Sequence, residues 1–593
     1  MGGRLKPDIG ATAARGNACE EASLERTFVR FAAHTGNMTD LADSSTGAVE
    51  YEGDLALAAF SDHGPWQVTL EDARWRDRVD TIRSAVERQI PSLIRPTRIP
   101  AGGRLVVVSR HLGGAIAMWY LTGRRKGGSA STADVSRRLR QAAEELGPTF
   151  IKLGQIISSG QGIFPTELVD EFIKCRDQVP AESFETVRAV VESDLGQTLE
   201  AVFAEFDREP LAAASIAQVH RAVLADHISP GGGEEVVVKV QRQTVSELVH
   251  QDIKVLAWLA PFLIGRIPVA ALANPPALVE VFAETITEEL DFRLEAANMV
   301  DVAMSLRQLG QTAYVIPRPH PKLVTRRVMV MEKLSGFKFD DVAGIKDAGI
   351  DTHEIVRTSM IGFLEGAMIH GVFHGDLHGG NLFVQPDGRT ALFDFGITGR
   401  LSEKKRQAFL RLLMSGMISD VKGQLAAIRD LGALPLDTDL DVVFSDLGLD
   451  RAPIDPTALT PDELIEELQK FVKLLLGYGA RLPKELMLFV KNLMFVDAAI
   501  GTLAPDLDLF GEVTAIATHF AQNHGKRLAS EMGNPNKPLE VDLTSFKDSI
   551  GIDRSAESIT YNDLKARRDL IHKRMHDERP TISKKSWKDR FRR

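Results

Sequence analysis

Residues 374–381 read His-Gly-Asp-Leu-His-Gly-Gly-Asn, and residues 394–396 read Asp-Phe-Gly. Asp376 lies in the first motif and Asn381 follows it by five positions, while Asp394 opens the second motif 18 residues after Asp376. A segment of that length is just enough for a hairpin-like return that brings the two motifs together. Carboxylate and amide oxygens are the ligands that Mg²⁺ prefers. The motifs therefore predict a magnesium site with Asn381 and Asp394 as ligands and Asp376 beside it.

Phosphoryl transfer needs such metal ligands, a carboxylate near the acceptor hydroxyl and a lysine on the phosphates. The Asp-x₄-Asn spacing with a later Asp-Phe-Gly is that of the kinase catalytic loop, so Asp376 is the predicted catalytic carboxylate. Lys239 stands near the end of the β-branched segment Glu235–Val240, where a kinase-type fold presents its phosphate lysine. It precedes Asp376 by 137 residues, which is the expected order.

The acidic partner of Lys239 is open between two places in the sequence. Glu247 is near in sequence, but residues 288–295 hold four carboxylates in eight positions. On one helix, Asp291 and Glu295 would share a face at i, i+4. Carboxylates so close together repel one another, and the cluster therefore predicts a cation among them.

The loop over the phosphates is expected to be glycine-rich, because backbone amides must approach the ligand closely. Here residues 210–220 carry alanine in place of glycine, which narrows the φ range and stiffens the turn. We therefore expect a changed approach to the phosphates. The predicted nucleotide-binding residues are Lys239, Ala212, Ala213, Ala214, Ser215 and, at the end of the strand-like segment 315–333, Glu332.

The segment after Asp-Phe-Gly is short. Only Ile397–Leu401 separate Gly396 from a predicted helix over Ser402–Met414, and no Ala-Pro-Glu follows. Protein kinases use a long activation segment at this place to seat a peptide. A peptide substrate therefore has no obvious platform, and loop phosphorylation has no obvious target.

Together, these motifs resemble the ABC1/AarF/UbiB family of atypical kinases between Arg137 and Gly416. Phe150-Ile151-Lys152-Leu153-Gly154-Gln155 looks like the family's Lys-x-Gly-Gln signature, residues 212–215 like its alanine-rich loop, and residues 289–291 like its Glu-x-Asp motif. The resemblance implies that Glu295 pairs with Lys239 across a helical insert. It also implies that a helical N-terminal extension places Lys152 and Gln155 over the site, where Lys152 meets Glu289 and Asp291. The chain departs from the family at Ala217, where glycine is common.

The resemblance implies an α+β, helix-rich, bilobal protein-kinase-like fold. It also implies an ATP-binding atypical kinase or ATPase that uses ATP or ADP with Mg²⁺ and supports isoprenoid-quinone or membrane-lipid metabolism rather than phosphorylating proteins. One alternative is a small-molecule phosphotransferase of the aminoglycoside or choline kinase type, which shares His-Gly-Asp-Leu-His. The other is a nucleotide-binding scaffold with little turnover.

The expected organisation has five parts. Residues 1–70 are predicted to be a disordered N-terminal segment, and 71–180 the helical extension. Residues 181–332 are expected to form the kinase-like N-lobe with its insert, and 333–525 the C-lobe. Residues 526–593 form a basic C-terminal tail, whose last 29 residues hold twelve Lys or Arg against four Asp or Glu.

The bulk composition favours a cytoplasmic protein. The net charge of −10 argues against nucleic acid as a partner, and two cysteines do not make a disulfide framework. No uninterrupted apolar run is long enough for a predicted transmembrane helix. Leu105–Leu121 is read as a buried helix, with a membrane-surface helix as the alternative. The basic tail is predicted to be a solvated, partly helical segment. The alternatives are peripheral contact with anionic lipid on the inner face of the membrane, or contact with nucleic acid or a partner protein.

Overall fold

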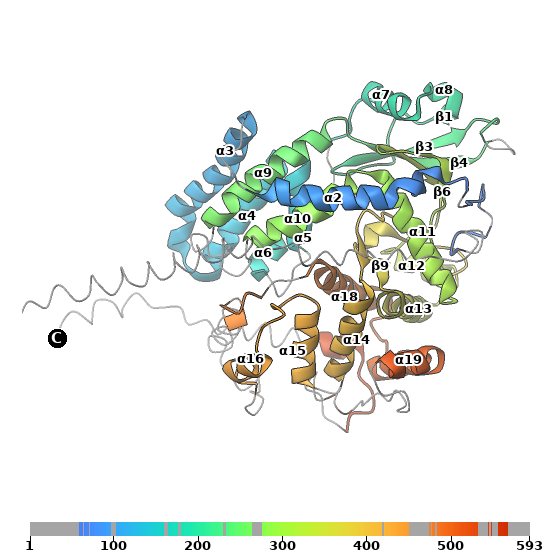
Figure 1. Cartoon of the computed structure of the whole chain (residues 1–593). Coiled ribbons are helices and arrows are strands. Elements are labelled where there is room, and N and C mark those ends of the chain that lie inside the picture. Colours follow the sequence, from blue (N-terminus) through green and yellow to red (C-terminus); the bar gives the residue numbers. More distant parts are fainter. Residues whose placement is uncertain are drawn as a thin grey trace, which may run out of the picture. The chain divides into compact units, whose positions relative to one another are not determined.

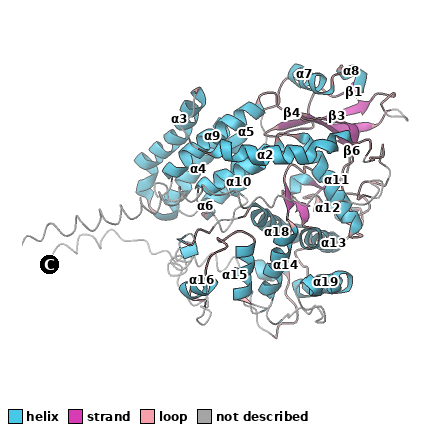
Figure 2. Cartoon of the chain, in the orientation of Figure 1, coloured by secondary structure: helices cyan, strands magenta, loops and turns pink. Residues whose placement is uncertain are grey.

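The computed structural model of the chain describes residues 58–62, 64–69, 71–95, 102–158, 164–175, 180–228, 233–263, 275–417, 420–449, 474–475, 477–480, 483–531, 544, 547 and 555–566. All of these belong to one compact unit, Tyr51–Arg593. The predicted disordered segment at 1–57 and most of the predicted tail lie outside the described residues. Within the described part, helices dominate and strands form three separate sheets, which confirms the helix-rich α+β prediction (Figures 1 and 2).

The largest sheet is antiparallel and forms the N-lobe. Its strand order is β1-β3-β4-β7-β6, and β2 pairs with β3 beside that path. The helices α7 (Phe184–Leu195) and α8 (Leu199–Val202) cover one face of this sheet (Figure 1). The strands are β1 (Phe203–Phe206), β2 (Ala212–Ala213), β3 (Ala217–Leu224), β4 (Glu235–Gln241), β6 (Pro319–Val324) and β7 (Val328–Glu332).

The alternating sequence of strand β4 places its valines on one face of the sheet and Lys239 on the other. Successive side chains of a strand point to opposite faces. Val236, Val238 and Val240 are buried in the apolar core that they share with α7 and α8. Lys239 is therefore turned to the other face, towards α11 (Phe292–Gln308). The alternation of the strand aims this lysine at its partner.

A helical extension precedes the N-lobe, and a helical insert interrupts it. α5 packs against α6, α9 and α10, so the extension and the insert share one apolar core. The extension consists of α2 (Val79–Ile94), α3 (Gly103–Met118), α4 (Gly128–Leu146), α5 (Pro148–Ser158) and α6 (Thr166–Ile173), with short turns at Arg74–Arg78, Trp119–Gly123 and Arg124–Lys126. The insert consists of α9 (Val245–Leu263) and α10 (Pro275–Glu289).

The C-lobe is built from helices around two small sheets. One sheet has the order β5-β11-β10-β8, and the other pairs β9 with β12. The strands are β5 (Tyr314–Val315), β8 (Phe337–Lys338), β9 (Val372–His374), β10 (Leu382–Val384), β11 (Thr390–Leu392) and β12 (Thr398–Arg400). The helices are α12 (Val342–Asp347), α13 (Thr352–Glu365), α14 (Glu403–Met417), α15 (Val421–Asp430), α16 (Leu440–Asp446), α18 (Lys484–Leu503) and α19 (Leu509–Glu531).

The single helix expected to carry both Asp291 and Glu295 does not form. The chain breaks at Leu290-Asp291 between α10 and α11, because the Asp291 carboxylate caps α11 by accepting from the Arg293 amide. Asp291 and Glu295 therefore do not share one helical face. Further along the chain, α13 is followed by a π-helical turn, Gly366–His370, which leads into β9.

Helix α3 is far more exposed than expected. Among the described residues, two helices are long and apolar enough to span a membrane by composition, Gly103–Lys126 and Lys484–Leu503. Within the apolar 18-residue stretch of each, 11 % and 39 % are buried, respectively. The first contains α3, and Val106 and Leu121 there are 68 % and 64 % exposed. The interpretation of Leu105–Leu121 as a buried helix is therefore wrong.

Residues 58–69 of the predicted disordered segment contact the N-lobe. Phe60 forms a parallel bridge with Ile316, and the Trp66 indole donates to the Pro319 carbonyl at 3.0 Å. The Trp66 ring also stacks at a tilt on His320, with 5.0 Å between centroids. In the described part of the chain, contact with the N-lobe therefore begins before residue 71.

Gly154 lets α5 approach α6 closely. A Cβ at this position would lie 2.6 Å from the Phe172 ring. We expect Gly154→Ala to lower the free energy of unfolding by about 1–3 kcal/mol through overpacking, as measured by chemical denaturation. Gly114→Ala in α3 is the control, because nothing lies within 4 Å of the added methyl. Equal stability of the two variants would contradict close packing at Gly154.

Candidate active site

His374 clamps the loop that carries Asp376. Its Nδ1 accepts from the Asp376 amide at 3.1 Å, and its Nε2 lies 3.0 Å from the Phe393 carbonyl, to which it donates. Burial lowers the pKa of this imidazole, which keeps it neutral and able to donate from one nitrogen while accepting at the other. The loop is thereby tied to the strand that delivers Asp394.

Helix α18 holds the same loop from the other side. Asn492 accepts from the Leu377 amide at 3.1 Å and donates to the His374 carbonyl, and Lys491 pairs with the Asp376 carboxylate. Sequence reasoning missed both residues. The available signal was the adjacent Lys-Asn pair between two apolar runs, residues 486–490 and 493–496, since buried polar groups need partners.

Lys239 is held between two carboxylates. Its Nζ lies 2.6 Å from Glu295 Oε1 and 3.1 Å from Asp394 Oδ1. Burial alone would lower the pKa of Lys239, but Asp394 and Glu295 outweigh burial and raise it above its ordinary value. The lysine therefore stays charged, as a group that contacts phosphates must. Glu247 makes no ion pair with Lys239 among the described contacts.

The backbone of Asp394 adopts a conformation that is uncommon for a residue other than glycine. It is the one non-glycine among the described residues with positive φ, at 56°, and it follows directly on β11 and Phe393. Burial would raise the pKa of Asp394, but Lys239 and Lys152 hold it below its ordinary range. Strained backbone of this kind clusters at functional sites. The carboxylate is therefore ionised and available to a cation.

Asn381 forms hydrogen bonds with the two segments that carry Asp376 and Asp394. Its Nδ2 donates to the Asp376 carbonyl at 3.1 Å, and its carbonyl accepts from the Phe393 amide at 2.9 Å. Because the bond to the Asp376 carbonyl uses the side-chain nitrogen Nδ2, the side-chain oxygen Oδ1 is the atom that would bind a cation. The pair Asn381 and Asp394 offers oxygen donors of the type that Mg²⁺ takes.

Lys152 reaches the catalytic loop from the N-terminal extension. Its Nζ lies 2.9 Å from Glu289 Oε1 and 3.9 Å from Asp376 Oδ2. Burial would lower the pKa of Lys152, but Glu289, Asp376 and Asp394 raise it, whereas burial raises the pKa of Glu289 to about 7. The ammonium therefore stays charged between two carboxylates that belong to different elements.

The remaining residues predicted to occlude the site are placed differently. Asp291 was expected beside Lys152, but its carboxylate pairs with the Arg293 guanidinium, at 2.6 Å from Nη2. Capping α11 fixes this orientation. Gln155 follows Lys152 by three positions on α5 and is half-buried.

The alanine-rich loop is a tight hairpin next to Lys239. The Ala214 amide donates to the Ala217 carbonyl at 2.9 Å, and Ala212–Ala213 pair with β3. Val219 of β3 lies opposite both Ala212 and Lys239. Arg242 Nε donates to the Ala214 carbonyl at 3.1 Å, and the side chain of Ser215 is buried. These hydrogen bonds therefore fix the conformation of the loop.

The described side-chain contacts of Glu332 involve none of the other predicted site residues. It ends β7, and its carboxylate accepts from the Ser61 hydroxyl and from the Arg318 amide, at 3.2 Å. Burial raises its pKa. Its side chain therefore joins residues 58–69 to the N-lobe sheet.

Helix α11 anchors the Asp-Phe-Gly segment through three positions. Glu295 pairs with Lys239, Asn298 donates to the Phe395 carbonyl at 2.9 Å, and Asp301 pairs with Arg400 at 2.6 Å. The spacing i, i+3, i+6 puts the three side chains on one face of the helix. Sequence reasoning found the first of them and missed the other two.

The charges of the centre are nearly balanced. The four acidic groups are Glu289, Glu295, Asp376 and Asp394, and the three lysines are Lys152, Lys239 and Lys491. Burial raises the pKa of Glu289 to about 7, so this group is only partly ionised at neutral pH. It is the oxygen donors of Asn381 and Asp394 that fit a divalent cation.

Residues 174–427 match the family model of the ABC1 atypical kinase-like domain. The chain is 35 % identical to an uncharacterised protein of Mycobacterium tuberculosis over 379 residues, which covers 63 % of this chain and 75 % of that protein. It is 31 % identical to an uncharacterised chloroplastic aarF domain-containing protein kinase of Arabidopsis thaliana, with 63 % of this chain and 72 % of that protein covered. It is also 31 % identical to the probable protein kinase UbiB of Xylella fastidiosa, with 63 % and 67 % covered.

We expect Asp394→Asn to weaken Mg²⁺-dependent nucleotide binding by at least about tenfold, or ~1.4 kcal/mol, because it removes the charged oxygen ligand. Isothermal titration of the full chain with ATP, with and without Mg²⁺, measures this effect. Asp387→Asn, on the β10–β11 turn, is the matched control, since that carboxylate pairs with Arg389 outside the centre. Unchanged binding by the Asp394 variant would remove Asp394 from the metal site.

Proposed function

This chain belongs to the ABC1 family of atypical kinase-like proteins, and we propose that its site binds ATP or ADP with Mg²⁺ and transfers the γ-phosphate to a small acceptor or to water. The observation that carries the proposal is the position of Lys239, which lies between Glu295 at 2.6 Å and Asp394 at 3.1 Å. This arrangement suits a phosphate lysine next to a metal ligand.

Each charged group has a definite task in this proposal. Glu295 keeps Lys239 in place while the ammonium exchanges Asp394 for phosphate oxygens. Mg²⁺, when held by Asn381 and Asp394, would neutralise charge on the phosphates. Burial would raise the pKa of Asp376, but Lys491 and Lys152 hold it below the ordinary range. Asp376 therefore orients the acceptor through hydrogen bonding and is too weak a base to take its proton early.

A peptide acceptor is disfavoured by the short segment after Asp-Phe-Gly. Residues 398–400 pair with β9, and α14 begins at Glu403, so no long segment is left to seat a peptide. Lys152 adds a second obstacle, because it brings the N-terminal extension to Asp376. These two features favour a small molecule or water as acceptor over a protein.

Service to isoprenoid-quinone or membrane-lipid metabolism is the part of the proposal that rests on the family resemblance. A small-molecule phosphotransferase of the aminoglycoside or choline kinase type is the second candidate, because it too lacks a peptide platform. A scaffold with little turnover is the third. The complete set of Lys239, Asp376, Asn381 and Asp394 supports turnover over a scaffold role.

We propose a cytoplasmic protein that attaches peripherally to the inner face of a membrane. The exposed apolar side chains of α3 and the turn after it include Val106, Tyr120 and Leu121. Arg124, Arg125 and Lys126 follow directly and are also exposed. An apolar face next to basic residues suits a bilayer with anionic headgroups. Helix α18, although apolar, contacts the catalytic loop and is better explained as a core helix.

The direct test is ATP turnover by the purified full chain, with and without anionic liposomes and a quinone-like phenol. We expect Mg²⁺-dependent turnover that rises when the liposomes and the phenol are present. The variant Tyr120→Ser/Leu121→Ser is expected to lose the liposome effect and keep the basal rate, because these residues lie away from the catalytic contacts. A phosphorylated phenol would identify the phenol as the acceptor, whereas release of free phosphate alone would identify water. Flat, near-zero turnover in all conditions would favour the scaffold.

A further inference from the structure

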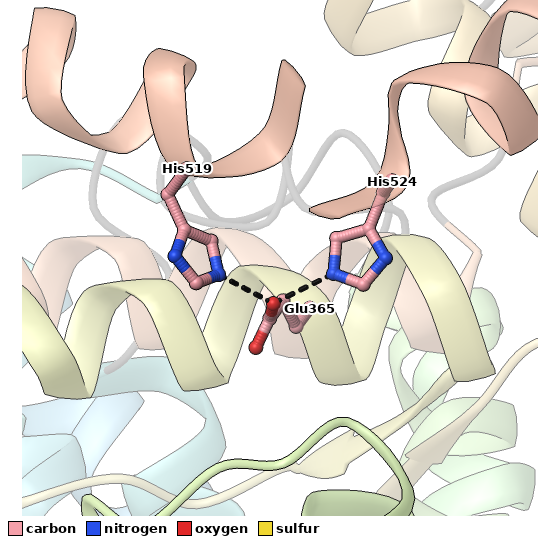
Figure 3. Close-up of side chains that lie close together, drawn as sticks. All are labelled: Glu365, His519 and His524. Atoms are coloured by element: carbon pink, nitrogen blue, oxygen red, sulfur yellow. Dashed lines mark hydrogen bonds and ion pairs between the residues drawn. The ribbon is translucent and has the colours of Figure 1, made fainter. Parts of the chain in front are cut away.

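Three metal-ligating side chains converge in the C-lobe outside the nucleotide site. Glu365 ends α13, and His519 and His524 come from α19. The Nε2 atoms of both imidazoles lie 2.7 Å from Glu365 Oε1 (Figure 3). All three ligand atoms lie within 4.8 Å of one another. Two imidazoles and one carboxylate therefore point at one small volume.

Neighbouring side chains fix the orientation of this cluster. Gln311 donates to Glu365 Oε2 at 2.6 Å, which leaves Oε1 to face the histidines. The Asn523 side-chain nitrogen lies 3.2 Å from His519 Nδ1, the ring nitrogen that points away from the carboxylate. In protein metal sites this outer ring nitrogen carries the proton and donates to an acceptor, which sets the tautomer. Metal binding at Nε2 would therefore need Asn523 to present its amide oxygen to Nδ1, whereas Gln311 already supports the carboxylate.

We propose that Glu365, His519 and His524 form a binding site for a divalent transition metal ion of the Zn²⁺ type. Imidazole nitrogen and carboxylate oxygen at about 2.0–2.2 Å are ordinary zinc ligands, and three protein ligands leave a fourth position for water or another group. Ligand atoms around a tetrahedral ion stand roughly 3.3 Å apart, so each 2.7 Å contact has to open by about 0.6 Å.

Burial and access both suit an ion. The Glu365 side chain is 1 % exposed, so its charge is removed from water and gains from a cation. The His519 side chain is 30 % exposed, which gives an ion a way in and a place for a water ligand. Because a metal ion takes the lone pair of Nε2, its binding would replace the contacts that both Nε2 atoms now make with Oε1.

The position of the site links it to the catalytic loop by the chain itself. Glu365 is followed by the turn Gly366–His370 and then by β9, which ends at His374. Helix α19 also holds that turn through Arg527, which donates to the Ile369 carbonyl at 2.8 Å. A bound ion would therefore fasten α19 to the segment from which the catalytic loop emerges.

The test is a Zn²⁺ titration of the full chain after chelator treatment, against a fluorescent zinc chelator and with excess Mg²⁺ to fill the nucleotide site. We expect one equivalent to bind, and His519→Ala and His524→Ala each to weaken binding at least about tenfold, since each removes one of three ligands. His353→Ala is the matched control, because that imidazole contacts Asp506 instead. Co²⁺ absorption in the visible range checks that the ion has nitrogen ligands.

The site is tested separately from the nucleotide site and from folding. Asp394→Asn is expected to bind Zn²⁺ as the wild type does, and thermal unfolding without metal shows whether each histidine variant folds. Failure of the folded wild type to bind Zn²⁺ at micromolar concentration would overturn the proposal. Binding that persists in both histidine variants, or that disappears in Asp394→Asn, would also overturn it and leave the cluster as a hydrogen-bonded clamp.

Discussion

The catalytic centre depends on buried lysines that meet carboxylates delivered by elements far apart in the sequence. Lys239 from β4 contacts Glu295 of α11 and Asp394 after β11, while Lys152 from α5 contacts Glu289 and the catalytic loop. A buried charge without a partner costs several kcal/mol, so each element holds the others in place. The N-terminal extension is thus part of the centre rather than an addition to it.

The central motifs could be predicted from the sequence because their chemistry lies in local spacing. The positions of Asp376, Asn381 and Asp394 follow from two short loops joined by a hairpin, and the structure brings these loops together. The alternation of β4 likewise indicates that Lys239 is set apart from its valine neighbours. In such segments, the spacing of residue types along the chain is enough to predict which side chains lie together.

Other parts of the site depend on tertiary packing that no local pattern encodes. Lys491 and Asn492 lie 115 and 116 residues after Asp376, in a helix whose sequence marks them as polar residues that need partners but does not point to Asp376. Asp291 was expected in the acidic cluster but caps α11, because the helix breaks there. The exposure of α3 could not be predicted either, since the sequence of an apolar helix does not say whether other parts of the protein cover it.

Lys152, which pairs with Glu289 and lies 3.9 Å from Asp376, is proposed to restrain the nucleotide site from the extension. The most direct measurement is ATP affinity and turnover of the variant Lys152→Met/Glu289→Gln, which removes the ion pair without leaving a buried charge alone. Lys174→Met, on an exposed pair with Glu171, is the control. We predict a change of at least about tenfold in affinity or turnover, equivalent to ~1.4 kcal/mol. Wild-type values for both in a folded variant would contradict this role of Lys152.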